Sequence, residues 1–184
     1  DKVIVSTDSK ETAKIAEDAG AFCPFLRPPN LSDSFVNLET VQQFSLEMLE
    51  KQGFIPNVIV HLEETFLFRP PELIDALILR LLDGGYDTVI AGRRESGWLW
   101  HETKDGKFQR VDSGDIPREL KENTFVGLQG LGCVTYPLFV RNGHLLGQNT
   151  GVYFTDHPLA GFEVRDEASR NIADIILNQT QGRR

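Results

Sequence analysis

Lys2-Val-Ile-Val-Ser-Thr-Asp8, followed directly by Ser9 and the stretch Lys10–Ala19, decides the fold. The apolar run ends in polar residues, which predicts a buried parallel strand that leads into an amphipathic helix capped by Asp8 or Ser9. A strand with a polar tip that feeds a helix is the unit from which α/β proteins build nucleotide sites. The segment therefore predicts an α/β fold with a ligand site at this strand end.

Strands and helices continue to alternate through the first half of the chain. The pattern predicts further strands at Phe22–Leu26, Val58–Leu62 and Asp87–Ala91, and helices at Leu38–Gln52 and Glu72–Leu82. Asn37 is the expected cap of the first of these helices, Pro70 and Pro71 open the second, and Gly84-Gly85 ends it. Such alternation predicts a mostly parallel sheet flanked by helices, within one domain that spans residues 1–184.

The second half of the chain has a different pattern. Trp98–His101 and Phe108–Val111, joined by the turn Lys104–Lys107, predict a projecting β-hairpin. The glycine-broken run Val126–Tyr136 indicates a close backbone approach within a sheet or around a ligand. Phe162–Val164 is expected to be a late strand and Asp166–Leu177 a closing helix.

Composition narrows the classes of function. The net charge of −8 and the pI of about 5.0 argue against a nucleic-acid backbone or an anionic membrane as partner. The sequence shows no signal peptide and no apolar run of membrane length. Cys23 and Cys133 lie in apolar surroundings and form no CxxC pair, so we expect reduced thiols and a cytoplasmic protein.

Polar residues follow three successive predicted strands, where ligands bind in open α/β sheets. They are Ser6-Thr7-Asp8, then His61, Glu63, Glu64, Thr65 and Arg69, then Arg93-Arg94-Glu95. Each group also has a simpler interpretation: Asp8 caps a helix, the glutamates are solvated, Arg69 pairs with one of them, and the arginine pair is exposed. The four histidines are scattered without ligand spacing, and no dinucleotide or P-loop fingerprint is present.

At these residues the chain resembles the acylneuraminate cytidylyltransferase family, which includes the CMP-sialic acid synthetases. Val3–Asp8 with Ala19-Gly-Ala21 resembles the family's "VSTD…A…GA" segment, and Phe25–Asp33 resembles its "RPxxLxxD" loop. Val58–Arg69 matches "LLQPTSPLR" at Leu62, Thr65 and Arg69. Glu163–Asp174 matches the register of the closing "DIDTEEDLxLAE" segment at Val164, Glu167, Ile172 and Ala173.

The resemblance implies a Rossmann-like nucleotidyltransferase fold and a reaction. Family members use CTP, Mg²⁺ and an acidic 2-keto sugar: the anomeric hydroxyl attacks the α-phosphate of CTP, and pyrophosphate leaves. Phosphoryl transfer of this kind depends mostly on positioning and on neutralisation of charge. The resemblance also implies a homodimer in which residues 98–128 form the dimerisation region and bring Arg118 near the partner's pocket.

The resemblance also assigns roles to particular positions. Ser6, Thr7 and Asp8 would bind the nucleotide, and Glu163 and Asp166 would hold the metal. The catalytic residues would be Glu63, Arg69 and Arg118, and the sugar would contact Glu63, Arg118, Gln129 and Gly130.

Three departures from the family pattern leave alternatives open. Arg165 stands at a metal-ligand position although arginine has no acceptor. Glu63 replaces a glutamine, and the family's basic glycine-rich loop at the N-terminus does not occur in this sequence, so we expect an N-terminally incomplete domain and a poor catalyst. One alternative is a catalytically impaired homologue that acts as a nucleotide- or sugar-binding or structural module. Another is a sugar nucleotidyltransferase that uses a different nucleotide.

Overall fold

The computed structural model describes residues 1–111, 116–120 and 122–181, with the side chains of Arg118, Thr180 and Gln181 excepted. The chain divides into two compact units. The first comprises Asp1–Ile59 and Thr135–Asn149, and the second comprises Val60–Val134 and Thr150–Arg184. Each unit is described below by itself. A single domain over residues 1–184 stays a prediction.

The first unit begins with residues 2–7, which run parallel to residues 22–26 through isolated bridges only and are called the first strand below. The predicted burial of this segment is wrong, since Val3 is 69% exposed and only Thr7 is buried. Isolated bridges join Ile4 to Phe22 and Thr7 to Leu26. The amide of Phe22 donates to the carbonyl of Val3 at 2.8 Å. Helix α1 (Lys10–Asp18) follows, and Ser9 is its cap, because the Ser9 side chain accepts from the amide of Thr12. A 3₁₀ turn, η1 (Pro29–Leu31), lies in the proline-rich loop.

Helix α2 (Leu38–Lys51) forms as predicted, and the Asn37 side chain caps it by accepting from the amide of Thr40 at 2.8 Å. It packs against α4 (Pro137–Arg141), a short helix that the sequence analysis missed. Arg141 fixes this contact, because its guanidinium pairs with Glu50 at 2.7 Å and its carbonyl accepts from the Gln43 side chain at 2.7 Å.

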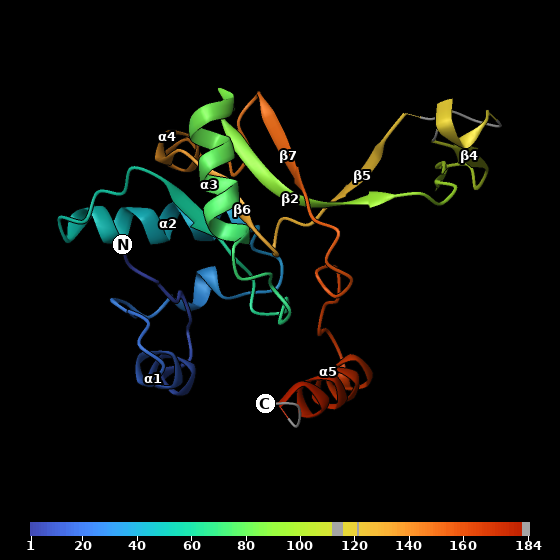
Figure 1. The fold of residues 1–184 in the computed structure, drawn as a ribbon. Coiled ribbons are helices and arrows are strands. Elements are labelled where there is room, and N and C mark those ends of the chain that lie inside the picture. Colours follow the sequence, from blue (N-terminus) through green and yellow to red (C-terminus); the bar gives the residue numbers. More distant parts are fainter. Residues whose placement is uncertain (112–115, 121, 182–184) are drawn as a thin grey trace. The chain divides into compact units, whose positions relative to one another are not determined.

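The second unit is built on a five-stranded sheet (Figure 1). Its strands are β1 (Ile59–His61), β6 (Cys133–Thr135), β2 (Thr88–Glu95) and β5 (Thr124–Gly127), in that order, and β7 (Thr150–Phe154) also pairs with β2. The β2–β7 pair is parallel and the β2–β5 pair is antiparallel. The fold is therefore α/β with a mixed sheet, and the mostly parallel sheet that we predicted is not confirmed.

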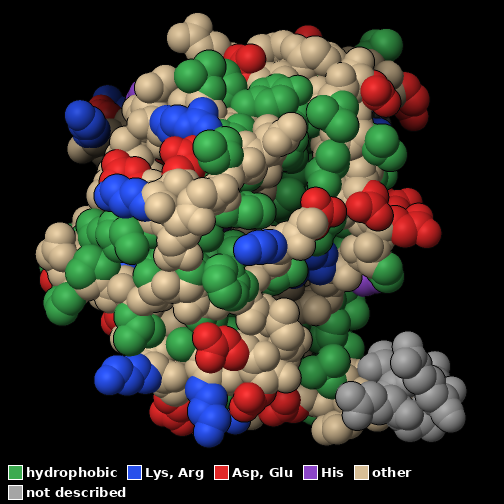
Figure 2. All heavy atoms as spheres, turned by 90° about the vertical axis from the view of Figure 1, so that its left-hand side faces the viewer, with side chains coloured by type: hydrophobic (Ala, Val, Ile, Leu, Met, Phe, Trp, Pro, Cys, Tyr) green, Lys and Arg blue, Asp and Glu red, His purple; other side chains and the backbone are tan. Residues whose placement is uncertain are grey.

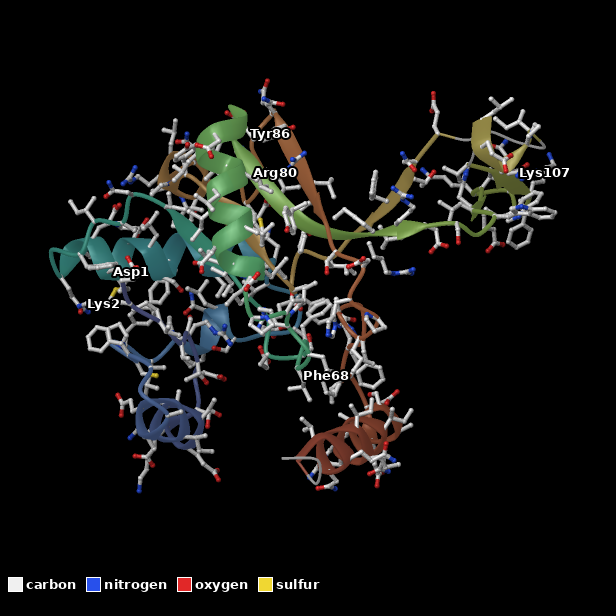
Figure 3. All side chains as sticks on the ribbon, viewed as in Figure 1. Asp1, Lys2, Phe68, Arg80, Tyr86 and Lys107 are labelled. Atoms are coloured by element: carbon white, nitrogen blue, oxygen red, sulfur yellow. The ribbon has the colours of Figure 1, made fainter. Side chains whose placement is uncertain are left out.

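Helix α3 (Leu73–Gly84) covers the sheet with Leu77 and Leu81, which are completely buried. Gly132 allows this contact, because a Cβ atom there would lie 2.6 Å from Cδ1 of Leu77. The close backbone approach predicted for the glycine-broken run is thus confirmed. Gly85 ends the helix at a φ of 67°. Beyond it, Tyr86 lies beneath the Arg80 guanidinium, 5.3 Å from its ring centroid (Figure 3).

The predicted hairpin is confirmed as a separate two-stranded antiparallel sheet, β3 (Trp100–Glu102) and β4 (Phe108–Arg110). Its turn closes through Gly106, whose φ is 75°. A 3₁₀ turn, η2 (Arg118–Leu120), lies further along the chain. Residues 112–115 and 121 of the predicted dimerisation region lie outside the described residues.

The late strand predicted at Phe162–Val164 is wrong, since these described residues form no strand. The Phe162 ring instead packs edge-on against Phe68, with ring centroids 5.8 Å apart. The strand of this region is β7, which was not predicted. Helix α5 (Glu167–Gln181) begins one residue later and ends four residues later than predicted.

Charged side chains of both signs occur on the surface. On the face shown in Figure 2, lysine and arginine side chains are interspersed with acidic and apolar ones and do not gather in one patch. Among the described residues, no helix combines the length and the apolar character needed to cross a membrane.

The cap of α2 gives a first test of this fold. Replacing Asn37 with Ala removes the acceptor for the Thr40 amide, and we expect a loss of about 1 kcal/mol in the free energy of unfolding. Asn37→Asp keeps the acceptor and should be nearly neutral. Urea denaturation of the three proteins measures the difference. Equal stability of the wild type and Asn37→Ala would contradict the assignment of this cap.

Candidate functional site

The predicted nucleotide-binding residues lie at the tip of the first strand, in the first unit. The Ser6 hydroxyl accepts from the Ser45 hydroxyl of α2 at 3.0 Å. Thr7 is buried, and its hydroxyl accepts from the amide of Ser9 at 3.1 Å, so it shapes the turn into α1. The carboxylate of Asp8 is about half exposed and forms an ion pair with Arg27. Of the three residues, Asp8 presents a charge to a ligand.

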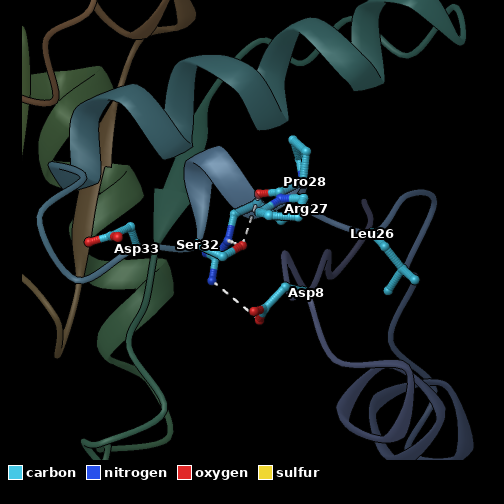
Figure 4. A pocket seen from close by; sticks show the side chains of 7 residues that line it. Asp8, Leu26, Arg27, Pro28, Ser32 and Asp33 are labelled. Atoms are coloured by element: carbon cyan, nitrogen blue, oxygen red, sulfur yellow. Dashed lines mark hydrogen bonds and ion pairs between the residues drawn. The ribbon is translucent and has the colours of Figure 1, made fainter.

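A pocket of about 650 Å³ opens beside this strand tip (Figure 4). It is lined by Asp8, Leu26, Arg27, Pro28, Pro29, Ser32 and Asp33. Most of these residues belong to the loop Phe25–Asp33, for which the sequence pattern predicted no site residue. The Arg-Pro pair of that motif was the signal that could have identified Arg27.

A second group of predicted residues lies in the second unit, around Arg69. The Arg69 guanidinium donates from Nε to the carbonyl of Leu131 at 2.7 Å, and from Nη2 to the carbonyls of Glu63 and Gly130 at 3.1 and 3.2 Å. Burial lowers the pKa of Arg69. Arg69 thereby joins the loop that contains Glu63 to the loop that contains Gly130 and Leu131. Because Nε and Nη2 donate to backbone carbonyls, the residue has a positioning role.

The Glu63 side chain lies directly against Gly130. The Glu63 amide donates to the Gly130 carbonyl at 2.8 Å, and a Cβ atom on Gly130 would lie 2.6 Å from Cδ of Glu63. Behind it, the buried His61 places Nε2 3.6 Å from Oε1 of Glu63. Burial lowers the pKa of His61, and the nearby Glu63 and Glu64 oppose that shift. The imidazole is therefore uncharged at neutral pH and does not neutralise Glu63.

The predicted metal-binding residues are engaged with other groups. Arg165 binds both carboxylate oxygens of Glu163, through Nε to Oε2 and through Nη2 to Oε1, and this hydrogen bonding lowers the pKa of Glu163. Asp166 caps α5 by accepting from the amide and the hydroxyl of Ser169 at 2.7 and 2.6 Å. Within residues 1–111, 116–120 and 122–181, no group of three or more His, Cys, Asp or Glu could hold a metal ion. Glu163, Arg165 and Asp166 therefore do not fit a Mg²⁺ site.

Backbone pairing brings the Glu163 segment to the Glu63 loop, since the Val164 amide donates to the carbonyl of Thr65 at 2.9 Å. The hydrogen bond to Glu163 raises the pKa of Arg165, and the charges of Glu163 and, more weakly, of Glu63 act in the same direction. The structure therefore gathers Glu63, Arg69, Gly130 and Glu163 in one region of the second unit. Gln129, next to Gly130, is half-buried. Arg118 begins η2, and its side chain lies outside the described residues.

Comparison with known proteins identifies the family. Residues 1–112 of the 184 match the family model described as cytidylyltransferase, so the chain belongs to the cytidylyltransferase family. This confirms, at low identity, the resemblance to the acylneuraminate cytidylyltransferases.

Two relatives and one solved structure show the extent of the similarity. The chain is 38% identical to a pseudaminic acid cytidylyltransferase of Campylobacter jejuni over 55 residues, 30% of this chain and 24% of that protein. It is 30% identical to N-acylneuraminate cytidylyltransferase A of Danio rerio over 104 residues, 56% of this chain and 23% of that protein. The match thus spans about a quarter of the length of these relatives.

The structure of 4-diphosphocytidyl-2C-methyl-D-erythritol synthase from Anaerococcus prevotii superimposes with a TM-score of 0.62. The two chains are 9% identical, and the match covers 97% of this chain and 82% of that one. This likeness shows a shared fold.

The role of Arg69 can be tested by a conservative change. Arg69→Lys keeps the positive charge but cannot reach three carbonyls at once, so we expect a loss of about 2–3 kcal/mol in the free energy of unfolding. Arg170→Lys, at an exposed position on α5, is the matched control and should change stability by about 0.5 kcal/mol or less. Denaturant unfolding of both variants measures the effect. Similar small losses in both would show that Arg69 does not join the two loops.

Proposed function

We propose that the chain is the core of a cytidylyltransferase that transfers CMP from CTP to the anomeric hydroxyl of a sialic-acid-like 2-keto sugar acid, releasing pyrophosphate. The observation that carries the proposal is the family match over residues 1–112, which includes the strand tip, the pocket beside it, Glu63 and Arg69. The relatives named for acylneuraminate and pseudaminic acid support the acidic sugar as acceptor.

In this proposal, the protein contributes mainly positioning and charge, as phosphoryl transfer requires. The strand tip at Ser6–Asp8 binds the nucleotide. Glu63, held over Gly130 by the three hydrogen bonds of Arg69, accepts a hydrogen bond from an acceptor hydroxyl. Arg118 and Gln129 complete the sugar site. The reduced cysteines, which form no disulfide, support a cytoplasmic setting.

A second candidate is a catalytically impaired homologue that binds nucleotide or sugar without turnover. Cytidylyltransferases generally use a divalent metal, yet Glu163 is bound by Arg165 and Asp166 by Ser169. A guanidinium has no acceptor and cannot serve as a metal ligand. The engaged carboxylates therefore favour weak catalysis over normal turnover.

Pyrophosphate release from CTP, Mg²⁺ and a panel of 2-keto sugar acids tests both candidates. We expect turnover well below about 1 s⁻¹, the lower end of the ordinary enzyme range. The reason is that the Arg165 guanidinium binds the Glu163 carboxylate, which is then not available to a metal ion. Arg165→Asp should raise turnover about tenfold or more by releasing Glu163 and adding a second carboxylate. Arg170→Asp, an exposed change on α5, is the control and should have no effect. Turnover near 1 s⁻¹ in the unchanged chain would contradict the impaired reading, and none in any variant would contradict the transferase.

We also propose that the hairpin region mediates homodimer formation. Trp98, Trp100 and Phe108 are 65%, 54% and 66% exposed, which is typical of an aromatic interface rather than a solvated surface. Sedimentation at micromolar concentration should show a dimer, and Trp98→Ser with Trp100→Ser should shift it to monomer. Phe35→Ser, at a 96% exposed position of the first unit, should leave the dimer intact. A wild-type monomer would contradict the proposal.

A further inference from the structure

We infer that the sugar acid accepted by this protein carries a cationic nitrogen substituent, an ammonium or an amidinium, and that Glu63 selects it over a neutral N-acylated sugar acid. This inference rests on the proposed function, because it takes Glu63 as a contact of the acceptor. It deepens that function by naming the charge of one substituent. A carboxylate has lone pairs for about four hydrogen bonds, so Glu63 can accept from this nitrogen and from a hydroxyl together.

The Glu63 carboxylate keeps a negative charge that the protein does not neutralise. Its side chain is 32% exposed, and the buried His61 imidazole places Nε2 3.6 Å from Oε1. Burial lowers the pKa of His61, so this neighbour is uncharged at neutral pH. In the described part of the chain, no lysine or arginine forms an ion pair with Glu63. The carboxylate is therefore available to a cation that a ligand brings.

Two arginines belong to this region, but their donors are directed to other groups. Nε and Nη2 of Arg69 donate to backbone carbonyls. The Arg165 guanidinium binds both carboxylate oxygens of Glu163. Glu64, the next residue after Glu63, is exposed and adds a second negative charge to the loop. The positive charge that would balance Glu63 is thus left for the ligand to supply.

The carboxylate is also fixed in position. The Glu63 amide donates to the Gly130 carbonyl at 2.8 Å, and a Cβ atom on Gly130 would lie 2.8 Å from Oε2 of Glu63. The same Cβ would lie 2.6 Å from Cε2 of Phe66, a buried ring. Charges interact more strongly beside buried apolar groups than in bulk water. A fixed carboxylate in these surroundings can discriminate between a charged and a neutral substituent.

The charge of the proposed acceptor makes this discrimination necessary. A 2-keto sugar acid is an anion, so its approach to Glu63 is unfavourable unless it also carries a positive charge. A carboxylate only accepts hydrogen bonds. An ammonium or an amidinium only donates them, whereas an N-acyl group has a carbonyl oxygen that a carboxylate repels. Acetamide and acetamidine groups have the same shape, and the chemistry of Glu63 favours the amidinium over its neutral counterpart.

Calorimetric titration of the 184-residue chain tests the inference with two 2-keto sugar acids that carry an acetamido or an acetamidino group on the same carbon. CMP is present throughout, because it fills the nucleotide site and cannot release pyrophosphate. We expect the wild type to bind the acetamidino acid about tenfold more tightly, the effect of one charge-assisted hydrogen bond. This preference should weaken as salt is added.

Two glutamate variants locate the origin of the preference. Glu63→Gln should bring the ratio of the two affinities close to one, because the glutamine amide is neutral and both donates and accepts. Glu64→Gln is the matched control, since it removes the same charge at the adjacent exposed position, and it should keep the preference. Circular dichroism verifies that each variant is folded.

The outcomes separate this inference from the proposed function. Equal binding of the two acids, a preference for the acetamido acid, or a preference that Glu63→Gln leaves unchanged overturns the selection by Glu63 and leaves the transferase standing. So does a preference that does not respond to salt, or one that Glu64→Gln abolishes as well. A preference that only Glu63→Gln abolishes, in a chain that never releases pyrophosphate from CTP, supports the cationic acceptor and overturns the transferase. Failure of the wild type to bind either acid overturns both.

Discussion

The candidate site of the second unit depends on the hydrogen bonds that the Arg69 guanidinium donates to backbone carbonyls. These bonds reach three backbone carbonyls, those of Glu63, Gly130 and Leu131, which belong to loops about sixty residues apart in the chain. Hydrogen bonds from a charged donor are stronger than neutral ones, and an unpaired buried carbonyl is costly. The loop after β1 and the loop before β6 are thereby held together, and Glu63 is fixed over Gly130.

Elements with strong local signals could be predicted from the sequence. Helices α1, α2 and α3 follow from apolar periodicity and from caps such as Ser9 and Asn37, and the hairpin follows from its aromatic runs around a glycine turn. Strand β7 was missed because Thr150–Phe154 contains a glycine and follows a polar segment. Phe162–Val164 has strand-like residues, but the half-buried Phe162 ring packs against Phe68 and the segment pairs with no strand.

The sequence indicates where candidate site residues lie along the chain, but it does not show the contacts that their side chains make. Polar strand tips located Asp8 and Glu63, because ligands bind at the carboxyl ends of strands. No local pattern could show that Arg69 donates to the carbonyls of Gly130 and Leu131, which are 61 and 62 residues away in the chain. Nor could it show that the Asp166 carboxylate accepts a hydrogen bond from the Ser169 hydroxyl. The ion pair of Arg27 with Asp8 forms only because the loop at residues 25–33 folds back toward the strand tip, which the sequence does not show.

We propose that this chain binds a cytidine nucleotide at the tip of its first strand. The most direct measurement is a titration of the isotope-labelled chain with CMP, followed by the chemical shifts of backbone amides in NMR spectra. We expect the largest shifts on residues 6–9 and 26–33, around the pocket beside Asp8 and Arg27. Shifts centred elsewhere, or none at millimolar CMP, would contradict it.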